Sequence, residues 1–162
     1  RSIELNQLSN QISVIHEDLK HLQPIFGHSG FDVVTCNPPY FKTPKSTEYN
    51  KNDYLTIARH EVLCTLEDVV KALKLHVKPG GKVVMVHRPG RLVDILTLFR
   101  KYRLEPKRLQ FIYPKKGKDA NMLLIEGIRD GKADLKLLPP LFIYEDDSTY
   151  TKEARDIIYG TS

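Results

Sequence analysis

Short runs of β-branched and aromatic residues, separated by polar stretches, predict the strands of a sheet. Residues 12–15 and 31–36 predict two buried strands, and residues 82–87 predict a third. The second strand must stop at the Asn-Pro-Pro sequence 37–39, because proline has no amide hydrogen and cannot continue a central ladder. The three runs therefore predict the interior strands of one sheet.

Two stretches with an apolar residue at every third or fourth position predict amphipathic helices. One covers residues 59–77 and is expected to end at the Pro-Gly-Gly sequence 79–81, and the other covers residues 92–102. Residues 109–113 and 121–125 then predict two strands joined by a polar loop. We expect these two strands to form an antiparallel hairpin at the end of the sheet.

This order of elements predicts an α/β fold with a mostly parallel sheet whose last strand runs backwards. The chain of 162 residues is long enough for one compact domain. We divide it into residues 1–137, which form the body, and residues 138–162, an extension packed on the same domain that carries a short helix near residues 151–158. Ligands of such sheets bind beyond the carboxyl ends of the strands.

Composition is that of a globular protein, with 41% hydrophobic and 28% charged residues. No apolar run approaches the roughly 20 residues of a membrane span, and no signal-peptide pattern occurs at the N-terminus. The two cysteines, Cys36 and Cys64, form no CxxC motif, which indicates neither a disulfide framework nor a metal site. We therefore expect a cytoplasmic protein without a membrane segment or a metal.

Positive charge is concentrated between residues 78 and 118, which contain twelve Lys or Arg residues and only two acids. Such a segment predicts a polyanionic partner, because phosphate contacts supply affinity that is independent of sequence. Lys115, Lys116 and Lys118 lie in the loop of the predicted hairpin and are candidates for contact with a nucleic-acid backbone. The structural alternative is a solvated helix face with solvated basic loops.

The sequence Asn37-Pro38-Pro39-Tyr40 carries the most informative chemistry. An exocyclic amino group of adenine or guanine is a poor nucleophile, because its lone pair is delocalised into the ring. The side-chain oxygen of Asn37 and the backbone carbonyl of Pro38 are acceptors for its two hydrogens. Tyr40 offers a face on which an extruded base can stack, which is worth about 1 to 3 kcal/mol. A second proline pair, at 139–140, has leucines in place of the Asn and Tyr neighbours. A Pro-Pro pair without these neighbours therefore indicates only the end of a strand.

Residues 31–41 resemble the NPPY motif region of amino-methyltransferases with the seven-stranded Rossmann-like fold. Within these, the chain resembles the bacterial tRNA adenine-N6 methyltransferase family that modifies the adenine next to the anticodon of a valine tRNA. The stretches that carry the resemblance are Asn37 to Phe41, Ala58 to Glu61, Arg88 to Leu92 and Tyr144 to Gly160. It implies a class I methyltransferase, S-adenosylmethionine as cofactor, tRNA as partner and the adenine N6 as the methylated atom.

The resemblance also implies roles for individual residues. Asn37, Pro38 and Tyr40 are the implied catalytic residues. The implied cofactor contacts are Asn37, the Asp18 carboxylate, which accepts from the amino group of the cofactor adenine, and the Leu19 amide, which donates to its ring. Glu17 is the competing acid, and capping a turn or helix is the other role open to Asp18.

Substrate contacts are expected from residues of three segments. Arg59 and His60 lie at a predicted helix start, where free amide donors favour anions, although both also suit a solvated first turn. The full set of candidates is Tyr40, Phe41, Arg59, His60, Lys115, Lys116 and Lys118.

The sequence departs from the family at its front. Such enzymes begin with a strand, a glycine-rich turn and a helix that hold the methionine part of the cofactor, yet no Gly-x-Gly occurs here. We therefore expect a chain that lacks the first two strands of the fold, binds S-adenosylmethionine poorly by itself and exposes apolar sheet edges. Residues 12–15 and 33–36 would then lie about 14 Å apart in the sheet.

Three other functions stay open for this sequence. An rRNA guanine-N2 methyltransferase and a protein glutamine-N5 methyltransferase resemble the same loop, and the basic segment favours RNA over protein. A non-catalytic RNA-binding fragment is the alternative from outside the enzymes.

Overall fold

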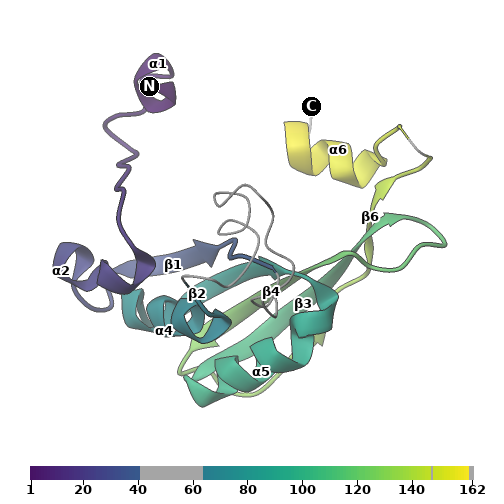
Figure 1. Cartoon of the computed structure of the whole chain (residues 1–162). Coiled ribbons are helices and arrows are strands. Elements are labelled where there is room, and N and C mark those ends of the chain that lie inside the picture. The colour runs from purple at the N-terminus through teal and green to yellow at the C-terminus, as the bar shows by residue number, and fades with distance from the viewer. Residues whose placement is uncertain (41–63, 147, 161–162) are drawn as a thin grey trace, which may run out of the picture.

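The computed structural model describes residues 1–40, 64–146 and 148–160, and a six-stranded sheet forms its centre (Figure 1). The strands are β1 (Phe31–Cys36), β2 (Val77–His87), β3 (Leu104–Lys115), β4 (Met122–Arg129), β5 (Lys136–Leu137) and β6 (Leu141–Tyr144). The helices are α1 (Ser2–Leu5), η1 (Leu19–His21), α2 (Gln23–Phe26), α4 (Leu66–His76), η2 (Pro89–Arg91), α5 (Leu92–Lys101) and α6 (Lys152–Tyr159). None of the helices in these ranges combines the length and hydropathy that a membrane span requires.

The sheet is mostly parallel, as the sequence predicted. β1 pairs with β2 in parallel, and β3 pairs in parallel with both β5 and β6. β4 alone runs backwards, and it lies between β2 and β3 in the order β1-β2-β4-β3-β5. The predicted hairpin is therefore confirmed, but its second strand is inserted into the sheet, and β5 and β6 extend the sheet beyond β3.

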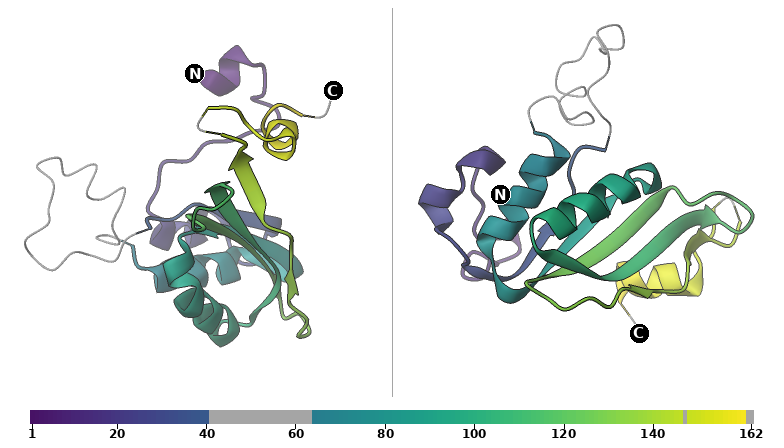
Figure 2. Two further views of the ribbon diagram at one scale, coloured as in Figure 1. Left: turned by 90° about the vertical axis from the view of Figure 1, so that its right-hand side faces the viewer. Right: turned by 90° about the horizontal axis from the view of Figure 1, so that it is seen from below.

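Helices α4 and α5 pack on the same face of the sheet, whereas α6 lies elsewhere, beside β6 (Figure 2). The predicted helix at residues 92–102 is confirmed by α5, whose Ile95 and Phe99 are fully buried. Phe99 lies against the backbone of β4, since a Cβ built on Gly127 would be 3.0 Å from its ring. The amphipathic pattern thus located the helix that closes the core.

The helix predicted from residue 59 has a different start in the structure. Residues 59–63 lie outside the described ranges, but Cys64 and Thr65 are not helical, so the continuous helix is wrong. α4 begins with a capping box, in which the Thr65 hydroxyl accepts from the Asp68 amide and the Asp68 carboxylate accepts from the Thr65 amide. This reciprocal cap satisfies two amide donors at the helix start, which a count of apolar positions does not detect.

The end of this helix was predicted to within one residue, but the Pro-Gly-Gly sequence is not what ends it. α4 ends at His76, and β2 begins at once with Val77, which pairs with Phe31. The Pro-Gly-Gly sequence 79–81 belongs to an irregular start of β2, where the register shifts before Val33 pairs with Lys82. Pairing with β1 decided this boundary, because it supplies the ladder hydrogen bonds that the helix would have used.

Gly81→Ala is expected to destabilise the protein by about 1 to 3 kcal/mol. A Cβ at this position would lie 2.8 Å from the Asp32 carbonyl oxygen and 2.9 Å from that of Lys78, and backbone atoms cannot rotate away. Urea denaturation measures the change. Gly90→Ala is the matched control, because a Cβ there meets nothing within 4 Å and should alter stability by less than about 0.5 kcal/mol. Equal losses of stability in both variants would show that contact between the new Cβ and the backbone carbonyls is not the cause.

Residues 12–15 do not form the predicted buried strand. The segment between α1 and η1 contains no strand and pairs with none of the described strands (Figure 1). Ile12, Val14 and Ile15 are 44%, 77% and 42% exposed. A β-branched run forms a strand only beside another strand, and no strand of the described ranges pairs with it. The predicted separation of two strands in the sheet therefore does not apply to this segment.

β1 is an edge strand within the described sheet, and its edge is apolar as the sequence predicted. Phe31 is 39% exposed and Val33 is 53% exposed. A groove of about 300 Å³ follows this edge, with Leu22 and Phe26 on its other side. The short helices η1 and α2 therefore cover β1 only in part.

Candidate active site

The carboxyl ends of β1, β2 and β3 lie along one edge of the sheet, because these strands run in the same direction. Asn37 follows the last residue of β1, and Arg88 follows the last residue of β2. The ladder pairs Cys36 with Met85, so the two strand ends are neighbours. The loops after β1 and β2 therefore meet at the edge where the sheet geometry predicts ligand binding.

Asn37 and Tyr40 are joined by a hydrogen bond within their own loop. The Tyr40 hydroxyl donates to the Asn37 Oδ1 atom at 2.5 Å. Asn37 is exposed, Pro38 is buried and Tyr40 is half-buried. Because an amide oxygen has two lone pairs, Oδ1 retains acceptor capacity for a second donor. The structure thus brings the two side chains of the NPPY sequence together at the surface, anchored by a buried proline.

The Tyr40 ring packs against the last residue of β2 and the residue after it. Its centroid lies 5.5 Å from that of the His87 ring, with an angle of 67° between the planes. The Arg88 guanidinium carbon lies over the same ring, 5.3 Å from its centroid. Sequence reasoning did not name His87 or Arg88 as site residues. Their position at the carboxyl end of a predicted parallel strand was the signal that could have found them.

His87 is fully buried and held in its neutral form. Its Nδ1 atom accepts from the Arg88 amide at 2.8 Å, which leaves the proton on Nε2. Burial, assisted by the nearby positive charge of Arg91, lowers the pKa of His87 from 6.5 to about 4. His87 therefore packs beside Tyr40 as an uncharged ring near neutral pH.

Acidification is expected to destabilise the protein through His87. Below pH 6.5 the unfolded chain binds a proton at this position and the folded chain does not, so the free energy of unfolding falls until about pH 4, where the folded chain also binds it. A shift from 6.5 to about 4 corresponds to roughly 3 kcal/mol. Urea denaturation between pH 7 and pH 4 measures this loss.

His87→Asn is the matched variant for the pH series. Asparagine keeps an acceptor for the Arg88 amide and does not titrate, so the variant should lose most of this pH dependence. His76, which is also buried and has a lowered pKa through burial, is present in both proteins and cancels in the comparison. An unchanged pH slope in the variant would show that another group is responsible.

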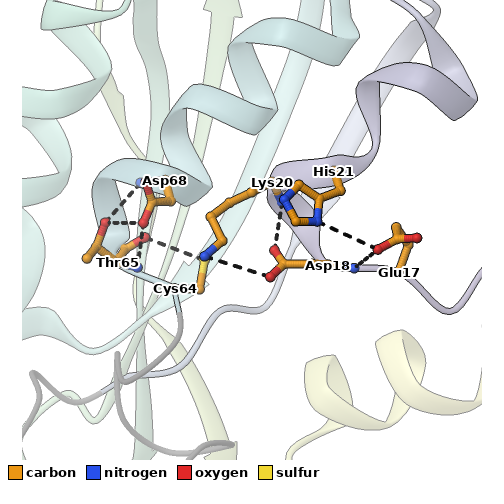
Figure 3. Close-up of polar contacts among 7 residues, drawn as sticks. All are labelled: Glu17, Asp18, Lys20, His21, Cys64, Thr65 and Asp68. Carbon is orange, nitrogen blue, oxygen red and sulfur yellow. Dashed lines mark hydrogen bonds and ion pairs between the residues drawn. The ribbon is translucent and has the colours of Figure 1, made fainter.

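The second candidate segment contains Glu17, Asp18 and Leu19, and Figure 3 shows the polar contacts of the first two. Asp18 caps η1, since its Oδ1 atom accepts from the Lys20 amide at 2.9 Å. The Glu17 carboxylate accepts from the Asp18 amide at 2.8 Å. The capping role that the sequence left open for Asp18 is therefore the one seen in its hydrogen bonds, and the role in cofactor binding remains a prediction.

A groove of about 410 Å³ opens beside this segment, lined by His16, Glu17, Asp18, Leu19 and Cys64. Cys64 precedes α4, and burial first and the charge of Cys64 second raise the pKa of Cys36 to about 11. Cys36 is followed directly by Asn37. Leu19 lines both this groove and the groove along β1 that reaches Cys36, so the Asp18 segment and the residue before Asn37 border neighbouring grooves.

The basic hairpin lies at the same edge as the NPPY loop. The Arg88 Nη1 atom donates to the Asn121 carbonyl at 2.8 Å, and Asn121 directly precedes β4. Lys115 ends β3, and Lys116 and Lys118 are exposed in the turn. The tertiary structure thus places the three predicted lysines on the edge that carries Asn37.

Three other predicted substrate contacts, Phe41, Arg59 and His60, lie outside the described residues. Within residues 1–40, 64–146 and 148–160, no group of three His, Cys, Asp or Glu side chains is arranged to hold a metal.

Curated relatives support the resemblance noted in the sequence. Two proteins from strains of Porphyromonas gingivalis, each named tRNA1(Val) (adenine(37)-N6)-methyltransferase, are 28% identical over 120 residues, which cover 73% of this chain and 46% of the relative. The chain resembles tRNA adenine-N6 methyltransferases. A third protein of this name, from Shewanella loihica, is 26% identical over 64% of this chain and 43% of its own length. The chain spans about half the length of the curated relatives it matches. No protein-family model matches it.

Solved structures establish the fold. A predicted O-methyltransferase from Agrobacterium tumefaciens superposes with a TM-score of 0.74 and 22% identity, over 99% of this chain and 70% of that one. The M1.HpyAVI–SAM complex gives a TM-score of 0.50 and 16% identity, over 86% and 68% of the two chains. At these identities the matches concern the fold alone, which this chain shares with methyltransferases of known structure.

Proposed function

We propose that this chain is part of an N-methyltransferase that transfers a methyl group from S-adenosylmethionine to the exocyclic N6 of an adenine in tRNA. The observation that carries the proposal is the loop after β1, where the exposed Asn37 oxygen and the Tyr40 ring meet at the carboxyl edge of a methyltransferase-type sheet. The named relatives support the adenine N6 as the target atom.

Asn37 and Pro38 are proposed to act as two fixed acceptors. When the target amino group donates its hydrogens to the Asn37 Oδ1 atom and the Pro38 carbonyl, its nitrogen is drawn toward a tetrahedral geometry and its lone pair becomes available for attack. The buried ring of Pro38 fixes the backbone, so the acceptors do not have to reorganise during the reaction. No strong general base is required, because the methylated amine loses its proton to solvent.

Tyr40 is proposed to stack on the target base. The Arg88 guanidinium covers one face of the ring, so the base would use the opposite face. Such stacking contributes about 1 to 3 kcal/mol per base. It also brings the base next to Asn37, because the Tyr40 hydroxyl is bonded to that side chain.

Asp18 and Leu19 are proposed to hold the adenine of the cofactor, with Asn37 as the third residue on the cofactor side. An ionised carboxylate only accepts hydrogen bonds, which suits an amino group, and Leu19 lines the same groove with an apolar surface that suits a ring. This hydrogen-bond acceptor and this apolar surface therefore fit the adenine end of S-adenosylmethionine. S-adenosylmethionine, when bound, supplies a methyl group on a positively charged sulfur.

The proposed RNA contacts extend from the loop to the hairpin. Lys115, Lys116 and Lys118 suit the phosphate backbone, since they lie on the edge of the sheet that carries Asn37. Phe41, Arg59 and His60 complete the proposed set on the strength of the resemblance.

A labelling experiment tests the proposal. This chain, and any longer natural form of it, would be incubated with labelled S-adenosylmethionine and, in separate reactions, with unmodified bulk tRNA, rRNA or cell protein. The digested products would then be analysed for methylated nucleosides and methylated glutamine. N6-methyladenosine is the expected product. N2-methylguanosine in rRNA, or label in a protein glutamine, would overturn the substrate but keep the amino-methylation chemistry. Absence of label from all three in every form would overturn the enzymatic function.

A further inference from the structure

We propose that Arg88 is a positioning residue that holds the Tyr40 ring in the orientation needed to stack a base, and that it acts on the reaction only through Tyr40. The inference rests on the proposed function of the NPPY loop and names a residue outside that loop. Its basis is the contact between a guanidinium that follows β2 and a ring that follows β1.

Arg88 is itself held at two points of the sheet. Its Nη1 atom donates to the Asn121 carbonyl at 2.8 Å, and its backbone amide donates to His87 Nδ1 at 2.8 Å. Both the backbone and the tip of the side chain are therefore tied to the ends of β2 and β4. Because both its backbone amide and its Nη1 atom are hydrogen-bonded, the half-buried Arg88 side chain has little freedom to move away from the Tyr40 ring.

One N–H group of the Arg88 guanidinium makes no hydrogen bond to a described residue. Its Nε atom is buried and has no hydrogen-bond partner among the described residues. Among the described residues, the hydrogen bond of the guanidinium is therefore made by Nη1 and not by Nε. The planar group lies over the ring with its carbon 5.3 Å from the centroid, where a cation is attracted to the π electrons.

Tyr40 transmits this orientation to the acceptor. Its hydroxyl donates to the Asn37 Oδ1 atom, so the direction of the ring also sets the position of the acceptor side chain. The His87 ring supports Tyr40 as a second contact, 5.5 Å between centroids. A line of contacts thus runs from Asn121 through Arg88 and Tyr40 to Asn37.

Arg88→Met is expected to lower kcat about 5- to 20-fold, the range of a partly buried cation–π contact, and to change KM for RNA by less than about twofold. Arg88→Lys keeps a cation but loses the planar group, so it should retain an intermediate rate. Arg100→Met is the matched control, because the Arg100 side chain on α5 is 65% exposed and pairs with Glu105, away from Tyr40. The control should leave kcat unchanged.

A double-mutant cycle separates positioning from a direct role. In a Tyr40→Leu background, Arg88→Met should change kcat by less than about twofold, because the residue through which Arg88 acts is absent. An undiminished effect in that background would overturn the proposal. Thermal unfolding of each variant identifies any that fail to fold, and Arg88→Lys then replaces Arg88→Met in the cycle.

A spectroscopic measurement on the free protein makes the outcome independent of activity. Nuclear Overhauser contacts between the Tyr40 ring protons and the Arg88 side chain are expected in the wild type and should be weaker in Arg88→Lys. Absence of these contacts in the wild type would overturn the inference even if the enzyme methylates tRNA. An inactive wild type with these contacts present would overturn the proposed function and leave Arg88 only as a support of Tyr40, which also ends its role in positioning a base.

Discussion

Replacing Asn37 with alanine is expected to lower the turnover of methyl transfer on the order of a hundredfold or more, with little loss of RNA affinity. The variant removes the exposed side-chain oxygen that is proposed to accept from the target amino group as the nitrogen becomes tetrahedral. Such an acceptor is used mainly in the transition state, so its loss acts on kcat. Single-turnover transfer of labelled methyl at saturating tRNA measures the rate, and filter binding measures the affinity.

Tyr40→Phe is the matched control for this variant. It removes the hydroxyl that donates to Asn37 and keeps the ring that is proposed to stack on the base. We expect a loss of only a few-fold, which corresponds to roughly 1 kcal/mol for one neutral hydrogen bond. Equal losses of turnover and RNA affinity in Asn37→Ala would contradict the acceptor role and indicate that Asn37 serves only to bind substrate.

Replacing Arg129 with methionine is expected to lower the free energy of unfolding by about 3 to 4 kcal/mol. The Arg129 Nη1 atom lies 2.7 Å from the Ser29 hydroxyl, 3.1 Å from the Lys74 carbonyl and 2.6 Å from the Val77 carbonyl. One cation at the end of β4 thus joins the turn before β1, the last turn of α4 and the start of β2. Methionine fills the volume but leaves these acceptors without a donor.

Urea denaturation measures the loss in Arg129→Met, and Arg103→Met is its control. The Arg103 side chain is 76% exposed and pairs with Asp130 at 2.9 Å, so its loss should cost less than about 1 kcal/mol. If both arginine variants lose the same stability, the removed charge rather than the three carbonyl and hydroxyl contacts accounts for the effect.

Local patterns located most elements of this protein because their causes are local. The run of β-branched residues at 31–36 and the apolar spacing at 92–102 each match one element of the structure, β1 and α5. Turn residues between 114 and 120 correctly separated the strands of the hairpin. In each case the hydrophobic side chains of one segment determine which of its faces is buried.

The patterns failed where a partner elsewhere in the chain decided the outcome. Residues 12–15 have the composition of a strand but have no strand beside them in the described structure. The start of α4 was set by the Thr65 and Asp68 cap, and its end was set by the pairing of Val77 with β1. Hydrophobic periodicity indicates whether a segment favours a helix or a strand, but it does not indicate which other segment pairs with it.

The candidate site also contains residues that the sequence predicted and residues that only the tertiary structure revealed. The sequence by itself predicted Asn37, Pro38 and Tyr40 as site residues, because one short loop offers two acceptors for an amino group and a ring for the base. Only the tertiary structure placed His87 and Arg88 against Tyr40, joined Arg88 to Asn121 and brought the basic hairpin to the same edge. These contacts join residues far apart in the chain. Those of Tyr40 depend on the parallel pairing of β1 with β2, and that of Arg88 with Asn121 depends on the insertion of β4 beside β2, and no local pattern specifies either pairing.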